Sequence, residues 1–314
     1  MKLHLDLNPE KPATAITHRD KLFLSGSCFT AHMSLRLQDA GFDIACNPAG
    51  TVFNPHSIAD ELMTIIVGKP PESKYIIKRD DRYLSFQAHS DISASTEGEL
   101  IKKMSSLQAK AAQDLQRSTY LLITLGSAFY YEHIQLKTVV ANCHKQTAIS
   151  FEKKLASPEE IVKQFDSVVT ALQTFNPDIK IIFTVSPVRH LRDGVVENNL
   201  SKSILRYAIH LLCSHHQNCA YFPAYELIND DLKDYRFYRE DLAHPTPQAI
   251  DYVWAKFTQT WFDAPTLQLA GLYEEKCRAL AHRQKEGDTA DAAFLRHLQK
   301  LEEKINVLQE RTNS

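Results

Sequence analysis

The fold of this chain is decided by residues 21–29, KLFLSGSCF. The apolar first half predicts a short buried strand, and a helical pattern of apolar residues begins directly behind Ser27. A strand that turns straight into a helix places a hydroxyl at the helix N-terminus, where free backbone N–H groups can hold a negatively charged oxygen. Ser27 is therefore a candidate nucleophile, although a serine at this position is more commonly a helix cap.

Apolar runs and helical patterns alternate from about residue 20 to residue 262. Strands are expected at 22–25, 42–45, 83–86, 120–125, 139–144, 180–185 and 220–222, and helices at 27–38, 57–67, 97–117, 158–172, 201–214 and 247–262. The runs at 120–125 and 180–185 are almost wholly apolar, as in strands that are buried on both faces. The alternation predicts an α/β fold with an open, mainly parallel sheet covered by helices on both faces.

In such folds, ligands bind beyond the carboxyl ends of the strands. Polar residues gather at the predicted strand ends and in the loops behind them, namely Ser27, residues 47–54, Gly126, residues 142–144, residues 186–190 and residues 241–244. The site is expected among these segments.

Composition narrows the class of protein. The 314 residues are 44% hydrophobic and 24% charged, with a formal net charge of -2 and no long basic block, so nucleic acid is not an expected partner. No window is apolar enough for a membrane span, and the first residues lack the apolar core of a signal peptide. The six cysteines form no C-x-x-C pair, which indicates reduced thiols and a cytoplasmic protein.

A resident metal or other cofactor is not expected. Although the chain has 14 histidines, it contains no H-E-x-x-H cluster. The group of His215, His216 and Cys219 is too sparse to predict a metal site.

Asp241 and His244 supply what a serine nucleophile needs. On one loop after the last predicted strand, the imidazole of His244 can reach toward Ser27 while Asp241 bonds its other ring nitrogen. That bond fixes the tautomer and stabilises the imidazolium that forms when the histidine takes the serine proton. A D-x-x-H tetrapeptide is common by chance, so its geometry has to be tested in space.

Several blocks resemble the GSCFA domain family of the SGNH (GDSL-like) hydrolase superfamily. They are residues 26–30 (GSCFT), 47–55 (NPAGTVFNP), 140–145 (VANCHK), 186–190 (SPVRH), 197–199 with 201–202, and 235–238 (YRFY) leading to 241–245 (DLAHP). Thr30 stands where the family name has alanine. The likeness spans residues 20–262 in order.

The resemblance implies a flavodoxin-like three-layer α/β/α sandwich with a serine esterase site. Ser27 would be the nucleophile, His244 the base and Asp241 the residue that orients it, with the amides of Ser27 and Gly50 as oxyanion donors.

One oxyanion donor of the superfamily, an asparagine in a G-x-N-D block, is absent, because the corresponding residues 126–129 read GSAF. Asn142, in a polar tip with His144, is the candidate substitute. Without any replacement, stabilisation of the transition state would fall by about 3 kcal/mol.

Two further groups allow two interpretations each. Arg189 and His190, with Asn198 and Asn199, either bind the leaving group or a polar carrier such as a sugar, or form a solvated loop before a helix. Cys28 is either a thiol nucleophile whose pKa the helix N-terminus lowers, or a small buried residue, and its usual burial favours the second interpretation.

Residues 264–314 differ in character from the hydrolase-like domain at 1–263. They predict a C-terminal helical hairpin broken near residues 285–288, whose second helix carries a stripe formed by Leu298, Leu301, Ile305 and Leu308. A hairpin packed on the domain is favoured over an arm that forms a homodimer, because the stripe is short.

Two functions are compatible with these residues. The first is a hydrolase of carboxylic esters that acts through an acyl-serine on a small-molecule or carbohydrate ester, with O-acetyl sugars suggested by analogy alone. The second is a non-catalytic binding protein that keeps the pocket. Intact Ser27, Asp241 and His244 favour the first function, and the altered block at Gly126 favours the second.

Overall fold

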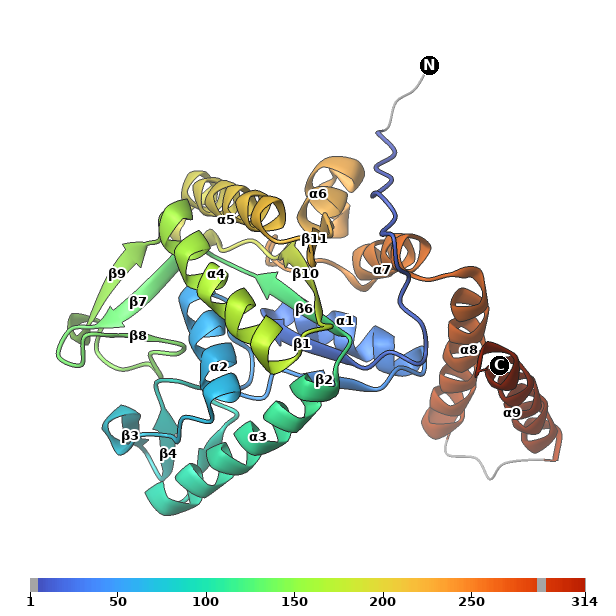
Figure 1. Ribbon diagram of the computed structural model, residues 1–314, viewed down its shortest axis with the longest axis horizontal. Coiled ribbons are helices and arrows are strands. Elements are labelled where there is room, and N and C mark those ends of the chain that lie inside the picture. The colour runs from blue at the N-terminus through green and yellow to red at the C-terminus, as the bar shows by residue number, and fades with distance from the viewer. Residues whose placement is uncertain (1–4, 287–291, 314) are drawn as a thin grey trace.

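A five-stranded parallel sheet forms the centre of the computed structural model, which describes residues 5–286 and 292–313 (Figure 1). Its order is β2-β1-β6-β10-β11, with β1 (Leu22–Gly26), β2 (Ile44–Cys46), β6 (Tyr120–Leu125), β10 (Lys180–Val185) and β11 (Cys219–Tyr221). The chain therefore winds outward in both directions from β1, which is the flavodoxin-like order. The predicted parallel sheet is confirmed.

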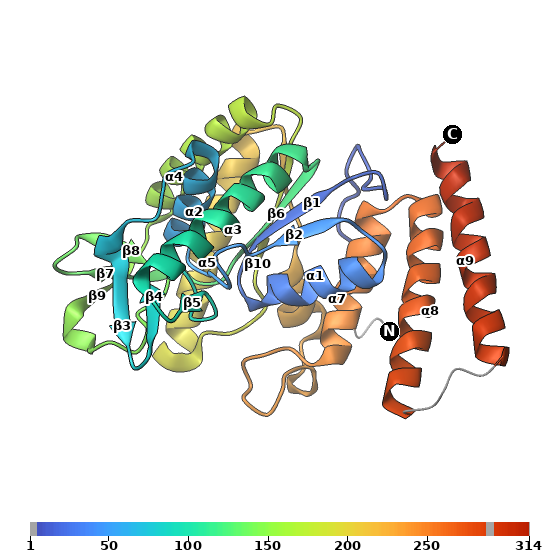
Figure 2. The same ribbon diagram turned by 90° about the horizontal axis from the view of Figure 1, so that it is seen from below.

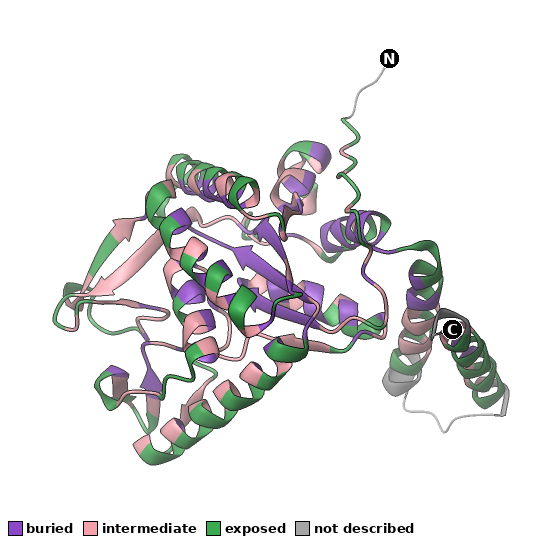
Figure 3. Ribbon diagram, in the orientation of Figure 1, coloured by how far each residue is buried: buried purple, intermediate pink, exposed green. Residues whose placement is uncertain are grey.

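Helices cover both faces of this sheet, as the two views in Figures 1 and 2 show. One face carries α2 (Pro55–Val67), α3 (Glu97–Arg117), α4 (Pro158–Phe175) and α5 (Val195–His215), and the other carries α1 (Cys28–Asp39) and α7 (Pro247–Trp261). Alternate side chains of each strand enter different cores, so Phe23 packs under α2 to α5 while Leu22 and Leu24 face α1 and α7. Figure 3 shows the central strands as buried. The three-layer α/β/α sandwich is confirmed.

Local signals at the helix starts explain why these segments are helical. Thr96 and Glu99 form a capping box at the start of α3, and Ser157 and Glu160 form another at the start of α4. The side chain of Asn54 accepts the N–H of Ser57 at the start of α2. The loop that carries the two Asn-Pro pairs therefore ends in a fixed cap.

Two small antiparallel sheets lie beside the central sheet at one end of the molecule (Figure 1). One contains β3 (Ile76–Arg79), β4 (Arg82–Ser85) and β5 (Ser93–Ala94), and the other contains β8 (Thr138–Val140), β7 (Phe129–His133) and β9 (Phe151–Leu155). The predicted strand at 139–144 was too long. It ends at Val140, because the side chain of Asn142 accepts the N–H of His144 in a turn where His144 has φ 49°.

The helix predicted at 201–214 begins six residues earlier, at Val195 of α5. Asn198 and Asn199 consequently lie in the first turns of a helix, and Asn198 is buried. The expected loop at these two residues is therefore the start of a helix, on which Asn199 is exposed. The β-branched pair Val195 and Val196, followed by the two asparagines, has low helix propensity and concealed the start.

Short elements connect β11 to α7. They are α6 (Ala224–Glu226), a π-helical turn at Leu227–Leu232 and a 3-10 turn at Tyr235–Phe237. Other 3-10 turns lie at Ser73–Tyr75, Ala148–Ser150 and Leu191–Asp193. This segment leads to the D-x-x-H loop, which lies beside the residues that follow β10, because the amide of Arg189 donates to the carbonyl of Ala243.

The C-terminal residues form the predicted helical hairpin, made of α8 (Ala264–Glu286) and α9 (Ala292–Asn313), at the end opposite the small sheets (Figures 1 and 2). On α8, Tyr273 packs beside His18, with ring centroids 5.7 Å apart, and Glu274 accepts the indole N–H of Trp254 at 2.7 Å. The expected break at 285–288 falls partly outside the described residues. In the predicted stripe, Leu301 and Ile305 are buried.

The division of the chain at residue 263 and a homodimer through the C-terminal helices stay predictions. Among the helices within the described ranges, none combines the length and the apolar character needed to cross a membrane.

Substitution of Gly26 tests the close packing at the end of β1. Its φ is +145°, and a Cβ there would lie 2.3 Å from the carbonyl oxygen of Thr124 and 2.9 Å from Oγ1 of Thr30. Gly26→Ala is expected to lower the free energy of unfolding by about 3 kcal/mol, since the backbone of Thr124 cannot move away without breaking its pairing in the sheet. Urea denaturation measures this change. The matched control is Gly98→Ala on α3, where a Cβ meets open space and no loss is expected.

An equal effect of the two substitutions would contradict this account of the strand end.

Candidate active site

Ser27 occupies the N-cap position of α1 directly after β1, in an extended conformation with φ −67° and ψ 176°. Its side chain makes no capping hydrogen bond. The Oγ atom is buried and has no hydrogen-bond partner among the described residues. The alternative interpretation of Ser27 as a capping serine therefore does not apply, and the hydroxyl is left uncommitted.

The two backbone amides predicted as oxyanion donors already have partners. The amide of Ser27 donates to the carbonyl of Thr124 at 3.2 Å, and that of Gly50 donates to the carbonyl of Asn47 at 2.8 Å. The side chain of Asn47 also accepts the amide of Gly26 at 2.8 Å. The Asn47 loop is thus bound to the end of β1, and either amide would have to share or exchange its bond to hold an oxyanion.

Asp241 and His244 form the pair that their spacing predicts. His244 Nδ1 lies 2.6 Å from Asp241 Oδ2, and the other carboxylate oxygen accepts the backbone N–H groups of Ala243 and His244, both at 2.9 Å. The N–H of His244, followed by that of Ala243 and by the imidazole, lowers the pKa of Asp241 to about 2. The carboxylate is therefore ionised at neutral pH and fixes the imidazole by its Nδ1, as a general base requires.

The loop that carries this pair is attached to the end of β10. The amide of Arg189 donates to the carbonyl of Ala243 at 3.0 Å, and the amide of Arg239 donates to that of His244 at 2.8 Å. The guanidinium of Arg189 lies over the ring of Tyr238, 4.0 Å from its centroid. Arg189 therefore supports the His244 loop, because both its amide and its side chain contact it.

His190 lies next to this loop and is largely buried. Its ring packs on Phe53 with centroids 5.1 Å apart, and its backbone N–H donates to Oδ1 of Asn198 at 2.9 Å. Burial, followed by the charges of Lys202 and His244, lowers the pKa of His190 to about 4, so the ring is neutral. Asn198 in turn donates from Nδ2 to Asn199 at 3.2 Å, which joins the predicted polar cluster to α5.

Asn142 and His144 belong to a different cluster. Asn142 Nδ2 donates to Ser90 Oγ at 3.4 Å, and His144 is buried with Nε2 2.7 Å from the carbonyl oxygen of Ser85 and Nδ1 3.3 Å from Ser90 Oγ. Burial lowers the pKa of His144. No hydrogen bond of the described residues joins this cluster to Ser27 or His244, so it supports the small sheet around β4.

The thiol alternative at Cys28 loses support. Burial raises the pKa of this thiol, and the helix N-terminus and the Lys202 charge only partly oppose that effect. Since the thiolate is the reactive form, a raised pKa disfavours Cys28 as a nucleophile.

Two charged residues near the strand ends, half-buried Glu61 and buried Lys202, were not singled out as functional groups by the sequence analysis. Glu61 on α2 lies 2.8 Å from Ser25 Oγ and 3.0 Å from the amide of Ala49, and burial raises its pKa to about 7. Lys202 on α5 is 2% exposed. The available signal was a charge on the apolar face of a helix, since Glu61 lies three residues after buried Ile58 and Lys202 three residues before buried Leu205.

A positive group, Arg239, and a second imidazole, His32, also lie near the candidate base. His32 on α1 has a lowered pKa, caused first by burial and then by the charges of Arg239, His244 and Arg36. His32 and Arg239 therefore lie within electrostatic range of the His244 loop, and neither was singled out from the sequence. Their neighbourhood favours a substrate with negative or strongly polar groups.

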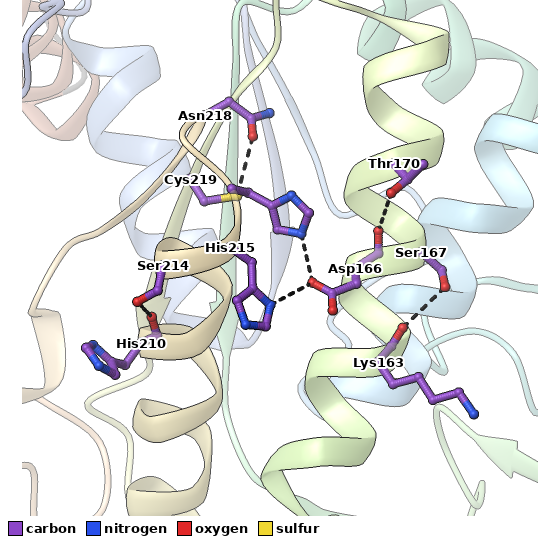
Figure 4. A network of polar contacts seen from close by, with 10 residues as sticks. Lys163, Asp166, Ser167, Thr170, His210, Ser214, His215, Asn218 and Cys219 are labelled. Atoms are coloured by element: carbon purple, nitrogen blue, oxygen red, sulfur yellow. Dashed lines mark hydrogen bonds and ion pairs between the residues drawn. The ribbon is translucent and has the colours of Figure 1, made fainter.

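His215, His216 and Cys219, the sparse group considered as a metal site, belong to a network of polar contacts between α4 and α5 (Figure 4). His215 Nδ1 and His216 Nε2 both contact Asp166 Oδ1 of α4, at 3.4 and 2.7 Å, and Cys219 Sγ lies 3.8 Å from Asn218 Oδ1. Within the described ranges, no three metal-ligating side chains converge on one point. The network fastens the end of α5 to α4.

A cavity of about 100 Å³ lies between α2 and α3, away from the Asp241–His244 pair. Ala49 and Glu61 reach its wall, and apolar residues such as Ile65, Met104 and Leu107 form much of the rest. Ser27 is not among the residues that line it. The candidate active site therefore rests on side-chain geometry and not on this cavity.

The fold and these side chains define an α/β protein with a serine, a histidine and an aspartate in the segments that follow the strands of its sheet. Residues 21–257 match the GSCFA family, and the chain belongs to that family. A similar solved structure is an acetyl xylan esterase (Est2A) from the rumen bacterium Butyrivibrio proteoclasticus, with 10% sequence identity and a TM-score of 0.39. The match covers 76% of this chain and 63% of that one, so the chain spans less than two thirds of its length. No curated protein matches the sequence.

The raised pKa of Glu61 predicts that the stability of the protein depends on pH in an unusual way. Its pKa is about 7 in the folded protein and about 4.3 in an unfolded chain. Between these values the folded state holds one more proton, so the free energy of unfolding decreases as pH rises and levels off above pH 7. Glu61→Gln removes this decrease, and its stability relative to wild type should rise by about 3 kcal/mol between pH 4.5 and pH 8.

Urea denaturation at both pH values measures the change, with Glu240→Gln on the exposed loop as the control. If the free energies of unfolding of wild type and Glu61→Gln changed with pH in parallel, the Glu61 carboxyl would be ionised at neutral pH and the prediction would be wrong.

Proposed function

We propose that this protein is an SGNH-type serine hydrolase that cleaves carboxylic esters through an acyl-Ser27 intermediate. The observation that carries the proposal is the Asp241–His244 pair, whose carboxylate is held by two backbone N–H groups and by the imidazole. The flavodoxin-like strand order supports it, because the segments that carry Ser27 and the pair follow strands of one parallel sheet.

The reaction proceeds in two halves. His244 Nε2 takes the proton of Ser27 as Oγ attacks the ester carbonyl, and the imidazolium then gives that proton to the departing alcohol. In the second half His244 takes a proton from water as the water oxygen attacks the acyl group. The imidazolium then returns this proton to Ser27 Oγ as the acyl–oxygen bond breaks and the acid leaves. Asp241 stays ionised throughout and stabilises the imidazolium.

Productive contact requires a local rearrangement. Ser27 Oγ is buried and bonds neither His244 nor any other described residue in this conformation. Catalytic hydrogen bonds are often formed only when substrate binds, and the proposal requires a rotation of the Ser27 side chain or a shift of residues 238–246 that joins Oγ to His244 Nε2. The amides of Ser27 and Gly50 would then supply oxyanion donors.

The substrate class follows from the polar surroundings. Arg239 and His32 near His244 suit a small-molecule or carbohydrate ester, and an O-acetyl sugar fits this class. The thiols of the described cysteines are free, which fits a reducing cytoplasmic setting. Neither nucleic acid nor membrane is part of the proposal, whereas a homodimer through the C-terminal helices is.

A second function, recognition without turnover, is favoured by one observation. The Ser27 hydroxyl is buried, and both predicted amide donors are already bonded within the chain. A binding protein would retain this closed arrangement when its ligand is present.

Hydrolysis of p-nitrophenyl acetate separates the two functions. Wild type should turn over the ester, and Ser27→Ala should lower kcat by about 1,000-fold or more because the acyl-enzyme cannot form. The matched control is Ser34→Ala on the same helix, since Ser34 is also buried but bonds the carbonyl of Ala31 and the thiol of Cys46, neither of them a candidate catalytic group. Equal rates for wild type and Ser27→Ala would remove Ser27 from the mechanism and leave recognition as the function.

A further inference from the structure

Lys202 is a buried cation whose hydrogen-bond partners within the described residues include no carboxylate. Its Nζ donates to the carbonyl oxygens of Gly126 at 2.6 Å and Ser186 at 2.7 Å. A lysine is rarely buried without an acidic partner, because removing its charge from water is costly. A neutral donor could bond the same two carbonyl groups with a smaller desolvation penalty than an ammonium group. The presence of a lysine at this position therefore indicates that its charge has a role.

The two carbonyl groups mark the carboxyl ends of the two central strands. Gly126 follows β6 and Ser186 follows β10, and the two strands pair along their whole length. Ser27 lies on the other side of β6, with its amide bonded to Thr124 of that strand. The charge of Lys202 also acts on Cys28, the residue next to Ser27. Lys202 therefore lies beneath the part of the sheet from which the site is built.

His190 is the group through which this charge can act. Its Nε2 lies 3.4 Å from the point that a Cβ on Gly126 would occupy. Within the described part of the chain, His190 hydrogen-bonds through its backbone N–H to Asn198, and its ring nitrogens are not used. The charges of Lys202 and His244 both act on this ring. A neutral imidazole still carries one N–H, which is free to donate to a substrate oxygen.

We propose that Lys202 is a positioning residue that holds Gly126 and Ser186 in place so that His190 donates its ring N–H to the acyl oxyanion. His190 would thereby replace the asparagine that is absent after Gly126, a role for which Asn142 is less suited because its amide already bonds Ser90. The inference rests on the proposed esterase function and deepens it.

The protonation state of Lys202 gives this role a pH signature. Burial lowers the pKa of Lys202 to about 7. Its titratable neighbours are Cys28, His190 and Tyr225, the last with its ring centroid 5.7 Å from Nζ. Either protonation state keeps the two N–H groups for the carbonyl contacts. The positive charge that favours a neutral His190 and a negative oxyanion is present below pH 7 and lost as pH rises through it.

Lys202→Met tests the proposal with p-nitrophenyl acetate between pH 6 and pH 9. We expect kcat to fall by about 100-fold, as when one oxyanion donor is removed, with KM changed by less than about threefold. The decline of wild-type kcat above pH 7 should be absent from the variant. Lys256→Met is the control, because Lys256 is also buried and bonds Asp6 and Asn8 on another part of the fold.

Two variants of His190 test whether its ring N–H donates to the oxyanion. His190→Gln keeps an N–H donor and should retain kcat within about tenfold, whereas His190→Leu should lose about 100-fold. Combining Lys202→Met with His190→Leu should cost little more than the worse single change, because both remove the same donor. Additive losses would overturn the proposal, and so would equal kcat values for the glutamine and leucine variants.

The outcomes separate this inference from the proposed function. Wild type that fails to turn over ester, or turns it over as fast as Ser27→Ala, overturns both. Turnover that depends on Ser27 but is unaffected by Lys202→Met overturns only the role of Lys202. Circular dichroism checks that each variant folds. If Lys202→Met does not fold, the two His190 variants decide, and equal kcat values for His190→Gln and His190→Leu overturn the proposal.

Discussion

The close contact of Gly26 with the backbone of Thr124 fixes the geometry on which the rest of the site depends. Because no side chain separates the two strands, β1 pairs with β6 up to its last residue and the amide of Ser27 bonds the carbonyl of Thr124. Helix α1 must then begin at once, and its N-cap side chain is held at the strand end without a capping bond. The candidate nucleophile is therefore positioned by backbone packing and not by its own hydrogen bonds.

Two charged side chains, half-buried Glu61 and buried Lys202, hydrogen-bond to the polar ends of an otherwise apolar sheet. Glu61 joins Ser25 of β1 to the loop that precedes Gly50, and Lys202 joins the residues that follow β6 and β10. Both come from helices on the same face of the sheet, and burial moves both pKa values toward neutrality. Glu61 and Lys202 therefore place two groups beside the site whose charge can change near physiological pH, as is typical of functional regions.

The sequence predicts the parts of this fold that depend on local pattern. The strands at 120–125 and 180–185 were placed to the residue, because continuous apolar runs have few alternatives. Strands β7 and β9 were missed, since their half-exposed mixture of aromatic and charged residues has no clear period. The contact between Asp241 and His244 is local and was predicted, whereas the contacts of Lys202 join segments far apart in sequence.

The central claim is that Ser27 is a nucleophile that His244 activates. Incubation with a fluorophosphonate probe, followed by mass spectrometry of the tryptic peptides, tests it most directly because the probe reacts only with an activated hydroxyl. The account predicts one adduct per chain, located on Ser27, and a much slower reaction of His244→Gln. An unlabelled protein, or an adduct on another residue such as Cys28, would contradict it.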